Sequence, residues 1–122
     1  TISDLQKLEG DDAFYVSKKT GVRTGFALVN FDGILGNDTL RQAVFMAIDG
    51  QTLCDVTVGG MYNYGPGVVP DTLAYDSEKL VNPYTYDQEA AIQLLDDNGI
   101  RDTDGDGIRE LDGENIVLEF DT

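Results

Sequence analysis

One segment of the sequence is apolar on both faces, and it constrains the fold more than any other feature. Residues 26–31 read Phe-Ala-Leu-Val-Asn-Phe, so a strand there would present apolar side chains to both sides of its sheet. Such strands lie in the interior of sheets that are covered on both faces. We therefore predict a buried central strand, in which Asn30 must find hydrogen-bond partners.

Residues 13–17 form a second β-rich run, and the polar stretch 18–24 between the two runs has Gly21 near its centre. This order predicts a β-hairpin. At the other end of the chain, apolar and polar residues alternate over 116–121, which predicts a half-buried strand.

Two segments predict amphipathic helices. The first spans 37–50, begins at a cap provided by Asn37 or Asp38, and ends near Gly50. Its apolar residues are spaced by three and four positions, as one helix face requires: Leu40, Ala43, Val44, Ala47 and Ile48.

The second predicted helix spans 88–98, after a cap at Asp87, and ends in a Schellman-type stop at Gly99 and Ile100. Residues 51–58 alternate like a strand but are too few to exclude a helical turn, so both assignments stay open. Residues 59–83 lack periodicity, and a loop of about 25 residues is either functional or braced by other parts of a protein. Together these elements predict an α/β (α+β) chain with helices packed on a small mixed sheet, forming one domain over 1–122.

Charge and composition exclude several classes of function. The chain has 23 acidic and 8 basic residues, a net charge of -15, and no histidine. Such a charge repels nucleic acid and anionic membrane surfaces, but it suits a divalent cation, a cationic ligand, or simply a solvated acidic surface. Without histidine, Ser-His-Asp and Cys-His catalysis and histidine zinc sites are excluded, so we do not expect an enzyme.

The single cysteine, Cys54, cannot form an internal disulfide and is expected to be a packing residue. No apolar run approaches the ~18 residues that span a bilayer, so we expect no direct membrane insertion of this segment. The first residues also lack the hydrophobic region of a signal peptide. If the protein is exported, its signal is expected outside this chain.

The sharpest motif is an acidic loop that begins at Asp102. Carboxylates at loop positions 1, 3 and 5, Gly107 at position 6 and a carbonyl at position 7 match the first half of a Ca²⁺ loop. Position 12 is Gly113 where an EF-hand has glutamate, so Glu110, Asp112 or Glu114 would have to complete the ligand shell. The predicted metal ligands are Asp102, Asp104, Asp106, Ile108 through its carbonyl, and Glu110. A turn that caps its own backbone amides explains the same residues, and both interpretations stay open.

Tyr62 and Tyr64 lie among glycines and Asn63 in the long loop. Aromatic faces with hydroxyl groups suit peptides and sugars, but the same residues could instead pack the loop onto its own domain. From their loop positions, Asn30, Tyr62 and Tyr64 are our candidate substrate-binding residues.

The order of these motifs resembles the family 5 extracellular solute-binding proteins, the oligopeptide, dipeptide and nickel-type receptors of ABC importers. The resemblance covers about residues 13–121 and rests on four segments: 28–31 (Leu-Val-Asn-Phe), 38–49 (Asp-Thr-Leu-Arg-Gln-Ala to Ala-Ile-Asp), the Gly-Gly loop with 65–70 (Gly-Pro-Gly-Val-Val-Pro), and 86–99 (Tyr-Asp-Gln-Glu-Ala-Ala to Gly). Relatives usually carry a basic residue where this chain has Gly50.

The resemblance implies a fragment of the second large lobe of a longer, two-lobed receptor, with a periplasmic-binding-protein-like type II fold. It implies that residues 51–58 form a short helix, and that the carboxylate which binds the ligand amine lies outside this segment. It also implies a peptide or small-molecule ligand, an ABC permease as partner, and an extracytoplasmic location, in the periplasm or as a cell-surface lipoprotein. Relatives often carry a similar Asp-Gly-Asp-Gly turn, which supports a structural role for the acidic loop with or without a metal.

The alternative function from another class is a calcium-stabilised adhesion or scaffold module of a secreted protein. A dockerin-like module of that kind needs a second Asp-x-Asp-x-Asp-Gly loop about 20 to 30 residues from the first, and the sequence has none.

Overall fold

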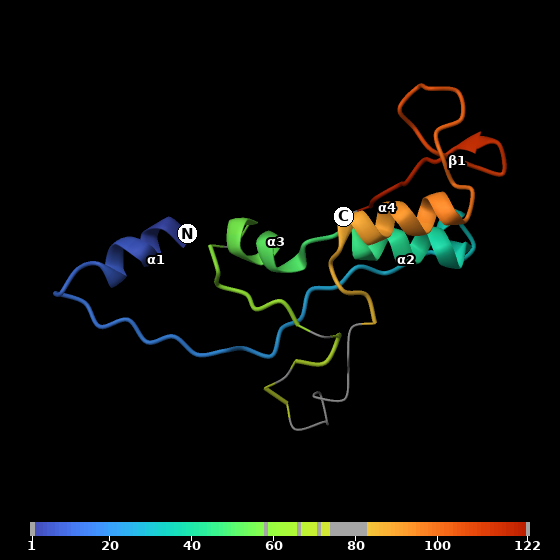
Figure 1. Cartoon of the computed structure of the whole chain (residues 1–122). Helices are drawn as coiled ribbons and strands as arrows, with labels where there is room; N and C mark the ends of the chain where they lie inside the picture. The colour runs from blue at the N-terminus through green and yellow to red at the C-terminus, as the bar shows by residue number, and fades with distance from the viewer. Residues whose placement is uncertain (1, 58, 66, 71, 74–82, 122) are drawn as a thin grey trace. The chain divides into compact units, whose positions relative to one another are not determined.

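The computed structural model describes residues 2–57, 59–65, 67–70, 72–73 and 83–121 (Figure 1). The chain forms two compact units. The first unit consists of Thr1–Phe26 and Gly50–Asn82, and the second of Ala27–Asp49 and Pro83–Thr122. That the whole chain acts as one domain stays a prediction.

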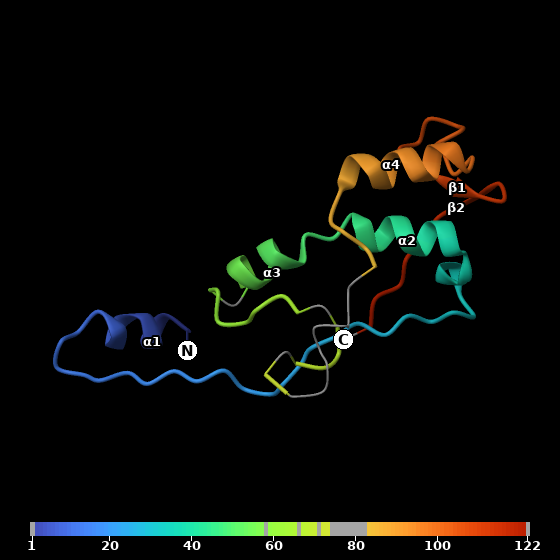
Figure 2. The ribbon, with the colours of Figure 1, turned by 60° about the horizontal axis from the view of Figure 1, so that its bottom comes forward.

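The second unit is built on two helices, α2 (Asp38–Met46) and α4 (Gln88–Asp97), which lie side by side in both views (Figures 1 and 2). Small side chains at the contact let the two helices approach closely. The buried apolar residues among those described all belong to this unit: Leu40, Ala43, Ala91 and Ile100. The core of the second unit is therefore the α2–α4 interface together with Ile100, which lies just beyond the cap of α4.

Both helices begin at the caps that the sequence predicts. Asn37 Oδ1 accepts a hydrogen bond from the N–H of Leu40 at 3.0 Å, and Asp87 Oδ1 accepts one from the N–H of Ala90 at 2.9 Å. The N–H of Asp87 also donates to the carbonyl of Met46 at 2.8 Å, which joins the end of α2 to the start of α4. These bonds fix the start of α4 relative to its neighbour.

Further contacts in the second unit hold α2 in place. A short 3-10 helix, η1 (Ile34–Gly36), precedes α2, and Arg41 donates to the carbonyl of Leu35 at 2.8 Å. The Arg41 guanidinium lies 4.9 Å from the centre of the Phe31 ring, close enough for a cation–π contact. At the far end of α2, Phe45 stacks on Tyr84 with ring centres 5.4 Å apart.

The sheet of the second unit consists of β1 (Glu110–Leu111) and β2 (Glu114–Asn115), which pair antiparallel. Asp112 and Gly113 connect them, with φ of 55° and 85°. Positive φ at both central residues is what a two-residue type I′ hairpin requires, and Asp-Gly is a favoured pair there. The sequence predicted a strand at 116–121 and not this hairpin, whose paired residues lie just before that segment, at 110–115.

The α/β class is confirmed, since helices combine with a small sheet, but the predicted strand positions are wrong. Residues 13–17, 25–31 and 116–121 form no strand in the described part of the chain. Phe26 and Leu28 are 61% and 87% exposed, so the predicted central strand is not buried. The reason is pairing: a strand has no internal hydrogen bonds, and among the described residues no neighbouring strand bonds to these segments. The sheet is correspondingly a two-stranded antiparallel one, where we expected a mixed sheet.

The first unit contains α1 (Ile2–Glu9), which the sequence analysis did not predict, and α3 (Gly50–Thr57). The short helix implied for 51–58 by the family resemblance is thus confirmed up to Thr57; Val58 lies outside the described residues. The predicted helix over 37–50 is too long, because α2 ends at Met46 and Gly50 begins α3. No helix in the described ranges is long and apolar enough to cross a membrane.

Candidate metal centre

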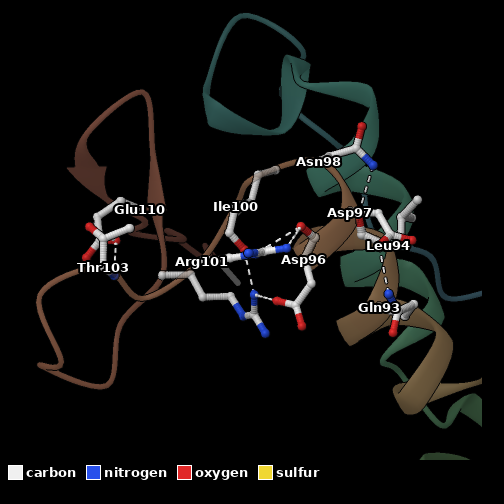
Figure 3. Close-up of polar contacts among 10 residues, drawn as sticks. Gln93, Leu94, Asp96, Asp97, Asn98, Ile100, Arg101, Thr103 and Glu110 are labelled. Atoms are coloured by element: carbon white, nitrogen blue, oxygen red, sulfur yellow. Dashed lines mark hydrogen bonds and ion pairs between the residues drawn. The ribbon is translucent and has the colours of Figure 1, made fainter.

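The acidic loop starts directly after α4, and the end of that helix fixes its position. Gly99 has φ of 76°, its N–H donates to the carbonyl of Asp96, and the N–H of Ile100 donates to the carbonyl of Leu95. This is the predicted Schellman stop. Arg101 adds two hydrogen bonds, from Nε and Nη2, to the carbonyl of Asp96 (Figure 3). The loop therefore leaves a helix end whose last carbonyls are satisfied.

Two polar pairs on α4 itself strengthen this end of the helix. Gln93 donates to the carboxylate of Asp97 at 2.7 Å, and Asn98 Nδ2 donates to the carbonyl of Leu94 at 2.8 Å (Figure 3). The first is a side-chain pair four residues apart on a helix surface, and the second satisfies one of the last carbonyls.

Asp102 organises the first half of the loop. Its two carboxylate oxygens accept from the N–H groups of Gly105 at 2.6 Å and Gly107 at 2.9 Å. The hydrogen bond from Gly105, and next the one from Gly107, lower the pKa of the Asp102 carboxyl below its ordinary value of 3.8, because they favour the charged form. Gly105 and Gly107 have φ of 84° and 89°, a backbone region that favours glycine.

The next two carboxylates also accept hydrogen bonds from the loop. Asp104 accepts from the N–H of Asp106 at 3.0 Å, and Asp106 Oδ1 accepts from the N–H of Ile108 at 2.7 Å. The other oxygen of Asp106 accepts from Nδ2 of Asn115 at 2.8 Å. This last bond ties the loop to β2, nine residues further along the chain.

Glu110 differs from the other three acids because it is only 7% exposed. Its Oε2 accepts from the N–H and the hydroxyl of Thr103, at 2.8 and 2.9 Å (Figure 3). Its Oε1 is buried and has no hydrogen-bond partner in the part of the chain that the structure describes. A buried carboxylate oxygen without a partner is rare, since leaving it unsatisfied destabilises the folded state.

The loop brings four of the predicted ligands together. Asp102, Asp104, Asp106 and Glu110 each offer a carboxylate oxygen, and these oxygens lie within 4.8 Å of one another. Hard oxygen donors gathered in this way suit Ca²⁺ or Mg²⁺. The fifth predicted ligand, Ile108, lies in the same loop with its side chain 44% exposed. That these residues bind a metal stays a prediction.

A salt bridge secures the strand that carries Glu110. Arg109 Nη1 lies 2.6 Å from Asp96 Oδ1 and donates to the carbonyl of Ile100 at 2.5 Å. The main chain adds a hydrogen bond from the N–H of Glu110 to the carbonyl of Arg101 at 3.0 Å. An open depression beside the loop is lined by these and neighbouring groups: Asp96, Arg101, Asp102, Gly107 and Arg109.

The candidate substrate-binding residues belong to different units. Asn30, in the second unit, is exposed, and its Oδ1 accepts from the N–H of Asp32 at 3.0 Å. Tyr62 and Tyr64, in the first unit, are 50% and 49% exposed. A Cβ at Gly50 would come within 2.1 Å of the Tyr64 ring, so this ring packs directly against the start of α3. Their role in binding a solute stays a prediction.

Sequence reasoning missed the residues that support the acidic cluster. Thr103 holds Glu110, Asn115 holds Asp106, and the Arg109–Asp96 pair joins β1 to α4. The Asp-Gly pair before Asn115 is a signal for the hairpin that brings it back to the loop. No spacing rule indicates the other two contacts.

Residues 1–122 match the model of a protein family described as "Bacterial extracellular solute-binding proteins, family 5 Middle". Searches of the curated proteins and of the solved structures each returned no significant match.

Proposed function

Because this chain belongs to the bacterial extracellular solute-binding proteins of family 5, and so has a solute-binding role in ABC transport, we propose that it serves in the capture of peptides or similarly small solutes. The observation that carries this proposal is the family match over the whole sequence. Members of this family are transport components, and we extend that to this chain, which lacks the histidine of common hydrolytic mechanisms.

The proposed mechanism is one of differential binding. A solute that makes more contacts in a closed receptor than in an open one shifts the hinge equilibrium toward closure, and the closed form then docks on the permease. In this proposal the chain supplies part of one lobe of a larger receptor. The receptor works outside the cytoplasm, in the periplasm or as a cell-surface lipoprotein.

Among the three candidate substrate-binding residues, Tyr62 is the one best placed to contact a solute. Half of its surface is exposed, and it lies in a loop that also contains Gly59, Gly60 and Gly65. Tyr64 is similarly exposed, but its ring packs on Gly50, so it serves to position the loop. The net charge of -15 favours solutes with a cationic group, such as the free amino end of a peptide.

The test uses the receptor that contains this chain, and it measures thermal unfolding with pools of di- to pentapeptides, single amino acids and sugars. Ligand binding to the folded state should raise its stability by about 2.7 kcal/mol at a ligand concentration of 100 Kd. Tyr62→Ala should weaken binding of the peptide that gives the largest rise. Tyr86→Ala, the same change at a residue 47% exposed, is the matched control.

A rise with peptides that Tyr62→Ala reduces and Tyr86→Ala leaves intact supports the proposal. If no peptide pool raises the unfolding temperature, the assignment to peptides is wrong. A rise with amino acids or sugars alone would identify those as the solute class instead. The adhesion or scaffold alternative is not favoured by any observation beyond the acidic loop, whereas the family match covers every residue.

A further inference from the structure

The four carboxylates of the loop are close together, and in the described part of the chain none of them forms a salt bridge. Their nearest oxygens lie within 4.8 Å of one another. Within the described ranges no lysine or arginine forms an ion pair with Asp102, Asp104, Asp106 or Glu110, and the nearby Arg109 pairs with Asp96 instead. Like charges at this separation repel one another, so a cation between them would stabilise the loop.

Hydrogen bonds within the loop explain the three aspartates without any ion, because each aspartate caps a backbone N–H. They also account for Oε2 of Glu110, which accepts from Thr103, but not for its Oε1. Glu110 is more than nine-tenths buried and belongs to the group of converging acids, yet its Oε1 has no hydrogen-bond partner among the described residues. Burial of a charged oxygen without a partner is costly unless a cation or a donor reaches it.

We propose that the loop from Asp102 to Glu110 is a Ca²⁺ site in which the buried Glu110 carboxylate completes the ligand shell. Asp102, Asp104 and Asp106 supply the exposed carboxylates and Ile108 supplies its carbonyl. Glu110, Asp112 and Glu114 were the three acids that could complete the ligand shell. Asp112 and Glu114 are exposed and do not belong to the group of converging carboxylates, so Glu110 is the one that fits. The hydrogen bonds already present leave lone pairs on the carboxylate oxygens for a metal.

The arrangement favours Ca²⁺ over Mg²⁺. Ca²⁺ accepts six to eight oxygen ligands in flexible geometry, whereas Mg²⁺ requires near-octahedral geometry and retains several waters. The loop offers up to five protein ligands, which is more than Mg²⁺ commonly takes from protein. Two of its glycines have positive φ, which lets the chain turn sharply around an ion. The bound ion would fasten the end of α4 to β1, since Asp102 follows the helix and Glu110 begins the strand.

The experiment is a CaCl₂ titration of the metal-stripped protein in 150 mM KCl, by calorimetry and by ¹H–¹⁵N NMR. We expect one saturable Ca²⁺ per chain, with the largest amide shifts at Thr103, Gly105 and Gly107. Mg²⁺ should bind more weakly by a factor on the order of ten. The salt suppresses diffuse binding to the acidic surface.

Glu110→Gln removes one charged ligand while its amide oxygen can still accept from Thr103. It should weaken Ca²⁺ binding by a factor on the order of ten or more. Glu114→Gln, the same change at an exposed position of the same hairpin, should leave the affinity within about twofold. If Glu110→Gln fails to fold by circular dichroism, the exposed Asp104→Asn replaces it, with the same expected loss.

Three results would overturn the proposal. The first is the absence of saturable binding at millimolar Ca²⁺, which would leave a loop closed by its own hydrogen bonds. The second is a set of amide shifts spread over the acidic surface instead of centred on the loop. The third is an equal loss of affinity in Glu110→Gln and Glu114→Gln, which would mean that charge alone, and not position, governs binding.

Discussion

Truncation of Leu40 tests whether the α2–α4 interface is the core of the second unit. Leu40 is 3% exposed, and Leu40→Ala removes three carbons there while keeping the backbone hydrogen bond to Asn37. At about 0.8 kcal/mol per buried CH₂, transfer alone accounts for about 2.4 kcal/mol. Any unrelaxed cavity adds to this, and buried Leu→Ala changes fall at roughly 2–5 kcal/mol. We expect about 3 kcal/mol.

The assay is urea unfolding followed by circular dichroism, with Ile92→Ala as the control. Ile92 lies on α4 and is 52% exposed, so its truncation should lower stability by less than about 1 kcal/mol. In a thermal melt, a loss of 3 kcal/mol should lower Tm by roughly 10 °C or more. Equal losses in the two variants, or a loss below about 1 kcal/mol for Leu40→Ala, would refute the assignment of this interface as the core.

Three further changes test local features of the second unit. Asp87→Ala removes the cap of α4 and should lower stability by about 1 kcal/mol in urea unfolding, because the N–H of Ala90 loses its acceptor; an unchanged midpoint would show that the cap is dispensable. Gly99→Ala should lower stability by about 1 kcal/mol because φ is 76° there, whereas Gly25→Ala, with equally open space and no positive φ, should be near neutral; equal effects would remove backbone strain as the cause. The pKa of Asp102 is lowered in the folded state, so its contribution to stability is present above the unfolded pKa and is lost as pH falls through the lower folded pKa. An NMR titration should therefore place the Asp102 midpoint below 3.8, and Asp102→Asn should flatten the acid side of the stability curve; a midpoint at or above 3.8 would contradict the hydrogen bonding described here.

Local signals predicted where α2 and α4 begin and where α4 ends, but not the end of α2 at Met46. The caps at Asn37 and Asp87 and the stop at Gly99 depend on hydrogen bonds within a few residues, so the sequence contains everything they require. The same holds for the acidic loop, where each aspartate accepts from an amide two to five residues away. The chain also carries a signal that we did not use, the Asp112-Gly113 pair that forms the hairpin.

Strands could not be predicted in this way, because the residues of a strand do not specify which other segment will pair with it. The segment 26–31 has the composition of a buried strand, but burial of a strand requires a paired strand at each edge and cover on both faces. No described strand pairs with it, and Phe26 and Leu28 stay exposed. Helix α3 illustrates the same limit, since the alternation over 51–58 was compatible with two structures. In the structure, the Tyr64 ring packs against Gly50 at the start of α3, and Gln51 donates to the Asp55 carboxylate within the helix.

For the candidate site, the sequence by itself determined which acids approach one another, because Asp102, Asp104 and Asp106 lie in one tight turn. Only the tertiary structure decided which acid joins them. Glu110 is drawn into the cluster because β1 is tied back to α4 by Arg109 and to Arg101 by its own N–H. Its carboxylate is buried there, with one oxygen lacking a hydrogen-bond partner among the described residues, and such burial depends on how separate segments pack and not on the spacing of residues along the chain.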